Sequence, residues 1–285
     1  MFDRSALAMP SRAFGDVGDV VVLLHGFPED LECWCAVADL LVAQGFRVVV
    51  PSLRGYDAAN SPRGIANYRA DRLMADVVGL IEELDTTRVH LVGHDLGGVL
   101  GWVVASSRPD LLLTFSAVTA PHPRAWLRTF VSWRQIHHSS YMLFLAIPYL
   151  PEFMLLSFNG WLGRKLLLRS GMNSAVVQRI LEKYLNNRRL LTGSLNWYRG
   201  MACDIIRGFG VRMVDVPTLV VFSDWGSWDK DLVARQTAAF VTSRFEWAVL
   251  DGVSHWVPLE APAELVDRLV SFIRRPGGER QERIG

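Results

Sequence analysis

The stretch from Arg88 to Gly101, with the sequence RVHLVGHDLGGVLG, places the strongest constraint on the fold of this chain. Its first half is apolar and β-branched and ends abruptly at Gly93, which is typical of a short buried strand. Its second half, from Val99 onwards, predicts a buried helix. A strand that turns directly into a helix crowds the residue between them, and flanking glycines relieve that crowding. We therefore expect Asp95 at the tip of the turn, before a helix N-terminus that favours negative charge.

Strands and helices alternate around this turn. Apolar, β-branched runs predict buried strands over 20–24, 46–51, 89–92, 111–118, 216–222 and 245–250. Amphipathic patterns predict helices over 34–43, 70–84 and 263–274. The weakly patterned first twenty residues leave room for one short edge strand. Such alternation indicates βαβ units and a mostly parallel sheet, and therefore an α/β fold.

A different pattern begins near residue 123, where the chain becomes helical and aromatic and no strand is evident before residue 214. We therefore predict a core formed by residues 1–122 and 215–285. Residues 123–214 are predicted as an inserted helical lid over the carboxyl ends of the strands, where open α/β sheets bind ligands.

Within this lid, the apolar run from Tyr141 to Gly163 has the length of a membrane span. Two prolines and two polar residues interrupt it: Pro148, Pro151, Glu152 and Asn159. We expect no membrane span and favour a lid packed over an apolar pocket. A lid that touches a membrane surface is the alternative.

Composition narrows the classes of partner. The chain has 30 basic and 29 acidic residues spread along its 285 positions, which gives no case for binding nucleic acid. Cys33, Cys35 and Cys203 are odd in number and lack the spacing of a metal site, which suits a reduced cytoplasm. No secretory signal is evident at the N-terminus. We expect a cytoplasmic protein that uses no metal or other cofactor, and the sequence is compatible with a homodimer.

Five short segments carry a family resemblance. In chain order they are HGFPE at 25–29, RGY at 54–56, GHDLGG at 93–98, LNWYR at 195–199 and GVSHW at 252–256. Together they resemble the α/β-hydrolase superfamily, and within it the epoxide hydrolases, over nearly the whole chain. The resemblance implies the α/β-hydrolase fold and an enzyme that opens a small apolar epoxide to a vicinal diol.

The same resemblance assigns the central catalytic roles. Asp95 stands at the nucleophile position, where a carboxylate can open a strained ring and leave an enzyme ester. His255 stands at the last catalytic position in the chain order, where it would activate water against that ester. Backbone N–H groups of Phe27 and Leu96 would form the oxyanion hole. By resemblance, the peptide between Phe27 and Pro28 is expected to be cis.

Lid residues are expected to complete the site. Tyr198 matches the family's lid tyrosine, and Tyr141 lies in a segment that resembles the second one, although Ala146 replaces a polar residue there. A phenol can give a proton to the alkoxide that ring opening creates. The alternative for both tyrosines is packing within the lid. We assign Trp197 to substrate binding. An apolar pocket is expected from the lid aromatics: Trp126, Trp133, Phe144, Phe153, Phe158, Trp161 and Trp197.

The acid that should orient His255 is displaced. In the family it sits nine residues after the proline of the preceding strand, and counting from Pro217 reaches Gly226. Asp224 lies two residues earlier and Asp229 three residues later. We favour Asp224 narrowly, because it lies nearest the strand end. A site without this carboxylate should still form the ester but hydrolyse it slowly.

Two other functions remain open. A haloalkane dehalogenase would share the aspartate and the histidine, but its halide-binding tryptophan directly after the nucleophile is Leu96 here. A non-catalytic or slow relative is the second alternative, and Gly226 is the best argument for it.

Overall fold

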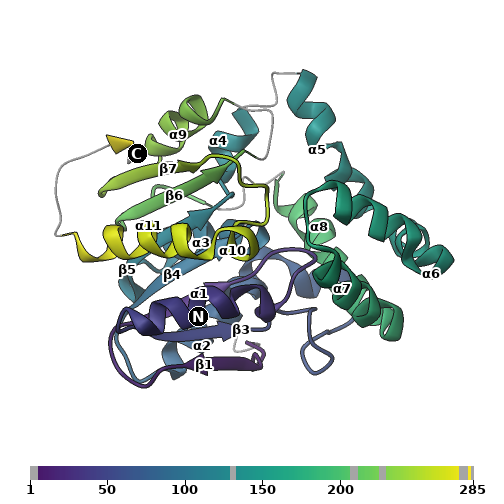
Figure 1. Ribbon diagram of the computed structural model, residues 1–285, viewed down its shortest axis with the longest axis horizontal. Coiled ribbons are helices and arrows are strands. Elements are labelled where there is room, and N and C mark those ends of the chain that lie inside the picture. Colours follow the sequence, from purple (N-terminus) through teal and green to yellow (C-terminus); the bar gives the residue numbers. More distant parts are fainter. Residues whose placement is uncertain (1–5, 129–132, 206–210, 225–228, 276–281, 284–285) are drawn as a thin grey trace.

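An eight-stranded sheet crosses the centre of the computed structural model, in the order β1-β3-β2-β4-β5-β6-β7-β8 (Figure 1). The structure describes residues 6–128, 133–205, 211–224, 229–275 and 282–283. The strands are β1 (Ser11–Phe14), β2 (Val20–Leu24), β3 (Arg47–Pro51), β4 (Val89–His94), β5 (Leu112–Val118), β6 (Thr218–Ser223), β7 (Phe245–Leu250) and β8 (Glu282–Arg283). β1 runs antiparallel to β3, and every other neighbouring pair is parallel.

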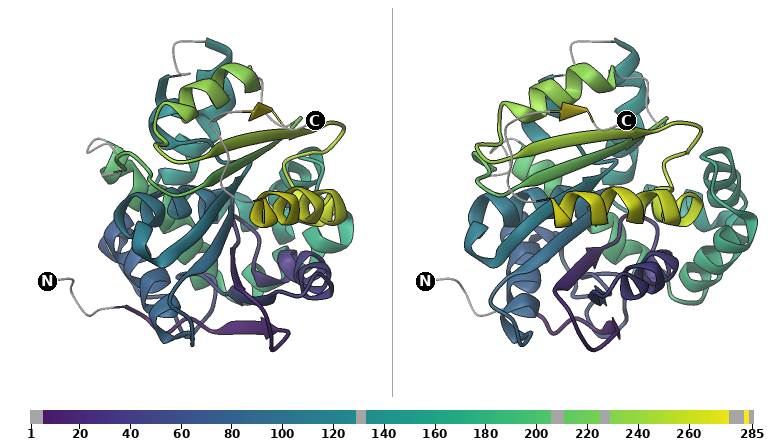
Figure 2. Two further views of the ribbon diagram at one scale, coloured as in Figure 1. Left: turned by 90° about the vertical axis from the view of Figure 1, so that its left-hand side faces the viewer. Right: turned by 60° about the vertical axis from the view of Figure 1, so that its left-hand side comes forward.

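Helices cover both faces of this sheet. Those of the core are α1 (Cys35–Ala43), α2 (Ala70–Glu83), α3 (Leu96–Ser107), α4 (Pro123–Arg128), α9 (Lys230–Ala238), α10 (Val257–Glu260) and α11 (Pro262–Arg274). Figure 2 shows α1 and α11 on one face and α2 and α3 on the other. Short 3-10 helices lie at Leu31–Trp34, Ile65–Tyr68 and Pro109–Leu111.

Strand β2 shows why the sheet is buried on both faces. Val20, Val22 and Leu24 pack into the hydrophobic cluster that contains α2 and α3. Val21 and Leu23, which alternate with them, pack into the cluster that contains α1 and α11. An unbroken apolar run is what a parallel strand with helices on both sides requires. The predicted α/β fold is therefore confirmed.

Element boundaries differ from the predicted ones by one or two residues. β6 begins at Thr218 instead of 216, because Pro217 has no N–H to donate to the ladder and only its carbonyl pairs, with Phe115. The helix expected from residue 34 begins at Cys35, after a 3-10 turn. The short edge strand expected in the first twenty residues is β1.

The inserted segment is helical. It contains α5 (Trp133–Ala146), α6 (Leu150–Arg169), α7 (Ser174–Asn186) and α8 (Arg188–Ile205), and Figure 1 shows α6 and α7 standing away from the sheet. α4 packs against α9 beside the sheet. In the described ranges no single helix is long and apolar enough to cross a membrane. Ser140–Ala146 and Leu150–Arg169 reach that length only as a pair bent by 95°.

Candidate active site

A sharp turn between β4 and α3 presents the side chain of Asp95. Its backbone has φ 50° and ψ −119°, a conformation that L-residues rarely adopt. The flanking glycines allow the turn to close: a Cβ on Gly93 would lie 2.4 Å from the carbonyl oxygen of Gly97, and one on Gly97 would lie 2.3 Å from that of Leu24. The strand, turn and helix expected from the sequence are confirmed.

Two backbone N–H groups hold the Asp95 carboxylate. The N–H of Phe27 donates to Oδ2 over 3.1 Å, and the N–H of Leu96 makes a second hydrogen bond to the same carboxylate. The peptide between Phe27 and Pro28 is cis, as expected. These are the two donors expected for an oxyanion hole. Phe27 is bonded to Oδ2, and the other oxygen, Oδ1, is the one that faces His255.

His255 faces that second oxygen. It lies in the loop between β7 and α10, is buried, and places Nε2 3.7 Å from Oδ1 of Asp95. A water molecule directed by Nε2 would therefore lie beside the Asp95 carboxyl carbon. The structure thus brings together the nucleophile and the histidine that the sequence assigned from positions 160 residues apart.

A buried ion pair lies directly behind the nucleophile. His94 Nδ1 is 2.8 Å from Oε2 of Glu29, and its Nε2 is 2.8 Å from the carbonyl oxygen of His255. Both partners are acceptors, so the His94 ring carries both protons. Burial lowers the pKa of His94, but the charge and hydrogen bond of Glu29 outweigh burial and the net pKa is raised. The pair thus joins the loop at Glu29, the turn at Asp95 and the backbone of His255.

Electrostatics around Asp95 act in opposite directions. Burial raises the pKa of its carboxyl group, whereas the His94 charge and the N–H groups of Phe27 and Leu96 lower it, and the net pKa is raised. A carboxylate with a raised pKa is a stronger base than an ordinary one.

The acids proposed to orient His255 lie elsewhere. Asp224 accepts a 2.5 Å hydrogen bond from the N–H of Gly252 and lies 3.7 Å from Lys230, and its side chain is about half exposed. Its own N–H donates to the carbonyl of Val253. Asp224 therefore clamps the turn that precedes His255.

Asp229 has a different role again. Its carboxylate accepts a hydrogen bond from the N–H of Leu232 and caps α9. Gly226, the position at which the family's acid was expected, lies outside the described residues.

These contacts give a graded prediction for ester hydrolysis. Asp224→Asn should slow it by about tenfold, because a weakened clamp displaces the loop of His255 at a cost comparable to one charge-assisted hydrogen bond. Asp229→Asn is the matched control and should do little, because asparagine also caps helices well. Single-turnover kinetics would measure both. A loss of about 10⁴-fold in Asp224→Asn would instead indicate direct contact with His255 during turnover.

A cavity of about 320 Å³ opens above Asp95. Its polar end contains Asp95, His255, Tyr141, Tyr184 and Tyr198. The remaining wall is mainly aliphatic: Leu145, Leu155, Leu156, Leu166, Leu167, Ile180, Leu181 and Leu191. Such a cavity favours an apolar molecule with one polar reacting group.

Both predicted lid tyrosines reach the cavity. Tyr198 comes from α8, is buried, and its ring packs edge-on against Phe27 at 5.4 Å between centroids. Burial and then the charge of Asp95 raise the pKa of both phenols, so both stay protonated at neutral pH. Tyr141 comes from α5 and also has an outer, solvent-facing side.

Most of the lid aromatics are not in the cavity wall. The Trp197 indole N–H donates to the carbonyl of Arg54, 2.7 Å away, and its ring packs against Tyr56, so Trp197 joins the lid to the core and does not line the cavity. Phe153, Phe158 and Trp161 are exposed, and only Phe144 of the expected set lines the wall. The side chain of Trp133 lies outside the described residues.

Sequence reasoning missed three side chains of the site. Tyr184 lines the cavity, and its hydroxyl donates to the carbonyl of Pro28 over 3.2 Å. Its spacing with Val177 and Ile180 is that of any buried helix face, so the sequence offers no separate signal. Glu29 and His94 lie inside the motifs HGFPE and GHDLGG. An acid in the first motif and a histidine beside Asp95 in the second could have indicated that the two side chains interact.

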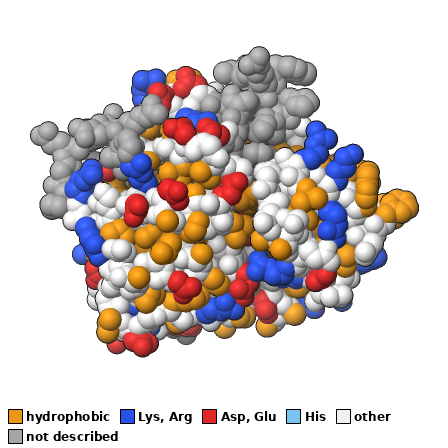
Figure 3. All heavy atoms as spheres, viewed as in Figure 1, with side chains coloured by type: hydrophobic (Ala, Val, Ile, Leu, Met, Phe, Trp, Pro, Cys, Tyr) orange, Lys and Arg blue, Asp and Glu red, His pale blue; other side chains and the backbone are white. Residues whose placement is uncertain are grey.

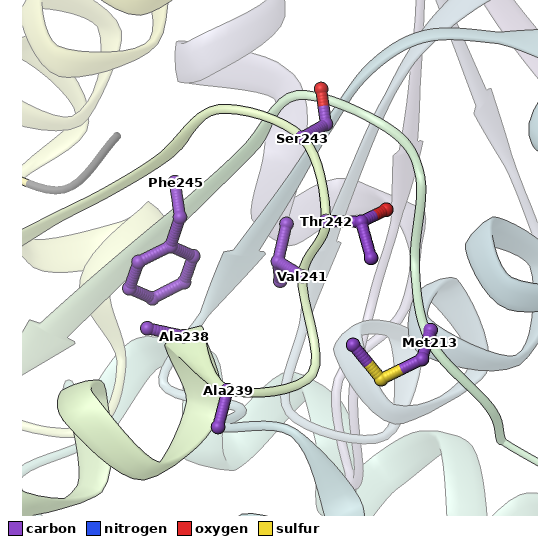
Figure 4. Close-up of a pocket in the computed structure, with 7 residues that line it drawn as sticks. All are labelled: Met213, Ala238, Ala239, Val241, Thr242, Ser243 and Phe245. Atoms are coloured by element: carbon purple, nitrogen blue, oxygen red, sulfur yellow. The ribbon is translucent and has the colours of Figure 1, made fainter. Parts of the chain in front are cut away.

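A second recess differs from the cavity above Asp95 in the residues that line it (Figure 4). It lies where β7 begins, at the opposite end of the parallel strands from Asp95. Its walls contain no titratable group: Met213, Ala238, Ala239, Val241, Thr242, Ser243 and Phe245. Within the described ranges no group of three His, Cys, Asp or Glu side chains is arranged to hold a metal ion.

The chain belongs to the α/β-hydrolase family, because the family model for the alpha/beta hydrolase fold matches residues 19–199. AB hydrolase superfamily protein YfhM of Bacillus subtilis (strain 168) is 31% identical over 268 residues, which cover 90% of this chain and 91% of that protein. Epoxide hydrolase 4 of Homo sapiens is 29% identical over 278 residues, which cover 93% of this chain and 75% of that protein.

Solved structures support the same fold. The crystal structure of a Bacillus megaterium epoxide hydrolase in complex with an inhibitor superimposes with a TM-score of 0.82 at 22% sequence identity. The match covers 94% of this chain and 97% of that one.

Proposed function

We propose that this chain is an epoxide hydrolase that converts small apolar epoxides to vicinal diols through an ester on Asp95. The observation that carries the proposal is that the two oxygens of the Asp95 carboxylate have different surroundings. The N–H of Phe27 holds Oδ2 and the N–H of Leu96 binds the same carboxylate, while Oδ1 faces His255 and the cavity that Tyr141 and Tyr198 line. The relatives named epoxide hydrolases support the same activity.

Ring opening is the first step. Oδ1 of Asp95 attacks an epoxide carbon, the carbon–oxygen bond of the ring breaks, and the alkoxide takes a proton from Tyr198 or Tyr141. Binding energy from the aliphatic wall would hold the ring carbon in line with Oδ1.

Ester hydrolysis is the second step. His255 removes a proton from a water molecule, and the hydroxide adds to the Asp95 carboxyl carbon. The negative charge then develops on Oδ2, to which the N–H of Phe27 already donates, and the N–H of Leu96 lies against the same carboxylate. When this intermediate collapses, the His255 imidazolium protonates the departing diol oxygen. The second proton of the water molecule is then lost from the Asp95 carboxyl group as that group ionises. It returns to the tyrosine that gave up its proton during ring opening and restores the phenol.

The geometry favours an epoxide over a haloalkane. A departing halide needs N–H donors, and the indole N–H nearest the cavity, that of Trp256, donates to Ser170 Oγ over 3.0 Å. The indole N–H of Trp197 donates to the backbone carbonyl of Arg54. The Leu96 side chain is buried and is not among the described residues that line the cavity. Two phenols instead match the need of an alkoxide for a proton. They also argue against a non-catalytic relative.

Removing the phenol of Tyr198 tests this proposal. Tyr198→Phe should slow ring opening by about 10²-fold or more, because general acid assistance is typically worth about 10² to 10⁴ and Tyr141 can supply part of it. The double change with Tyr141→Phe should slow it further. Tyr149→Phe, on the exposed side of the lid, is the matched control. Stopped-flow alkylation with a chromogenic styrene-type epoxide would report the rates, and equal rates in all variants would remove the tyrosines from the mechanism.

A further inference from the structure

Large apolar side chains cover the outer side of α5 and α6. They form what we call the lid apolar face: Leu143, Tyr149, Phe153, Phe158 and Trp161. Phe158 is 90% exposed and Tyr149 is 83% exposed. At the right-hand end of α6, Figure 3 shows hydrophobic side chains that project from the surface beside Lys and Arg side chains. Large apolar side chains that gather on an exposed surface often mark a binding surface.

The backbone at this face presents the aromatic residues outward. α6 is interrupted at Ser157, and the next three residues are left-handed, with φ 52° at Phe158, 55° at Asn159 and 75° at Gly160. A phenylalanine at positive φ is an outlier, and such strain is retained where a local shape has a use. The Phe158 side chain on this strained turn is exposed almost completely to solvent.

The charged residues between positions 140 and 169 indicate what kind of partner would bind the lid apolar face. Between residues 140 and 169 the sequence contains one acidic residue, Glu152, and its carboxylate is tucked against Arg199 at 2.9 Å. Arg164, Lys165 and Arg169 follow on α6, and Lys165 Nζ lies 5.0 Å from the centre of the Trp161 ring. Aromatic and leucine side chains beside basic residues are typical of helices that lie in the headgroup region of an anionic membrane.

The two helices that carry the lid apolar face also line the cavity. Leu155, Leu156 and Leu167 on the inner side of α6 line the cavity wall. Tyr141 and Leu166 line it as well, yet they are 44% and 47% exposed. The same two helices, α5 and α6, therefore supply both the lid apolar face and part of the cavity wall.

We propose that the lid apolar face docks the protein on a membrane surface that contains anionic lipid. Phe153, Phe158 and Trp161 lie in the headgroup boundary, and the basic residues of α6 lie against lipid phosphates. A symmetric contact between two copies would bring the basic residues near their own copies, whereas anionic lipid complements them. This docking does not depend on the proposed epoxide chemistry.

Vesicle co-sedimentation of the full chain tests the proposal. We expect binding to vesicles of phosphatidylcholine with phosphatidylglycerol, and binding to phosphatidylcholine alone that is weaker by about tenfold. The double variant Phe153→Ser with Phe158→Ser should lose about tenfold or more of its binding to the anionic vesicles. Val17→Ser, an equally exposed apolar position on the core, is the matched control and should bind like the wild type. Lys165→Glu with Arg169→Glu should abolish the preference for anionic lipid.

The outcomes separate the membrane from other partners. Wild-type protein that stays in the supernatant with both kinds of vesicle overturns the proposal, as does equal binding by the wild type and the double phenylalanine variant. Analytical ultracentrifugation without lipid gives the remaining test. A dimer that the double variant converts to a monomer would make this face a contact between copies and would also overturn the proposal. Circular dichroism of each variant verifies folding, and no readout requires activity.

Discussion

Asp95→Asn is expected to abolish formation of the covalent ester while the fold is retained. The amide keeps the shape of the carboxylate, and its oxygen can still accept the hydrogen bond from Phe27, so the strained turn should persist. Its nitrogen is not a nucleophile. The loss of single-turnover alkylation should exceed about 10⁴-fold, as is typical when the reacting group itself is removed. Intact-protein mass spectrometry after mixing with an epoxide would measure it.

Asp110→Asn is a matched control for this substitution. Asp110 is an exposed aspartate bonded to Arg108 at the start of β5, far from the cavity, and its replacement should leave alkylation unchanged. Slow conversion of the new asparagine back to aspartate would restore the wild-type mass, so the mass of the unreacted variant must be checked as well. Alkylation of Asp95→Asn at the wild-type rate would show that another group is the nucleophile.

His255→Gln should form the ester and then stall. Nε2 lies 3.7 Å from the attacking oxygen, close enough to direct a water molecule at the ester but not required for Asp95 to ionise. The protein mass should rise by the mass of the epoxide and remain raised, with turnover reduced by about 10²-fold or more. The wild type, handled in parallel, should return to its original mass.

This substitution leaves the surrounding structure in place. His94 bonds the backbone carbonyl of residue 255 and not its side chain, so the link to Glu29 persists in the variant. A variant that neither gains mass nor turns over would assign His255 a role in ring opening or in folding.

The nucleophile turn could be predicted from sequence because its causes are local. Gly93, Asp95 and Gly97 are neighbours in sequence, and the clash that demands glycine at position 93 is with Gly97, four positions away. The fold followed for a similar reason, since the apolar runs of the strands are contiguous and their alternation with helices leaves few topologies.

The lid could not be predicted in the same way. Aromatic composition suggested an aromatic pocket, but the side to which each ring turns depends on the 95° bend between α5 and α6 and on the left-handed turn at Phe158. Pro148 and Pro151 mark the bend and Gly160 marks the turn, but these residues do not determine the angle of the bend or the side to which the rings turn. The Trp197 indole likewise depends on Arg54, a partner distant in sequence that no local pattern identifies.

The acid near His255 shows a third kind of difficulty. Counting positions from a family pattern assumes a loop of constant shape, whereas Asp224 and Asp229 were close enough in sequence to serve equally. Their contacts separate them, because one clamps the turn at Gly252 and the other caps α9.

Isotope transfer in a single turnover tests the central claim most directly. With enzyme in excess over epoxide in water labelled with heavy oxygen, an Asp95 ester predicts a diol without label, because the new diol oxygen comes from the carboxylate. The label should appear in the peptide that contains Asp95, since water attacks the carboxyl carbon. A labelled diol together with an unlabelled Asp95 peptide would show that water attacks the epoxide directly and would contradict the account.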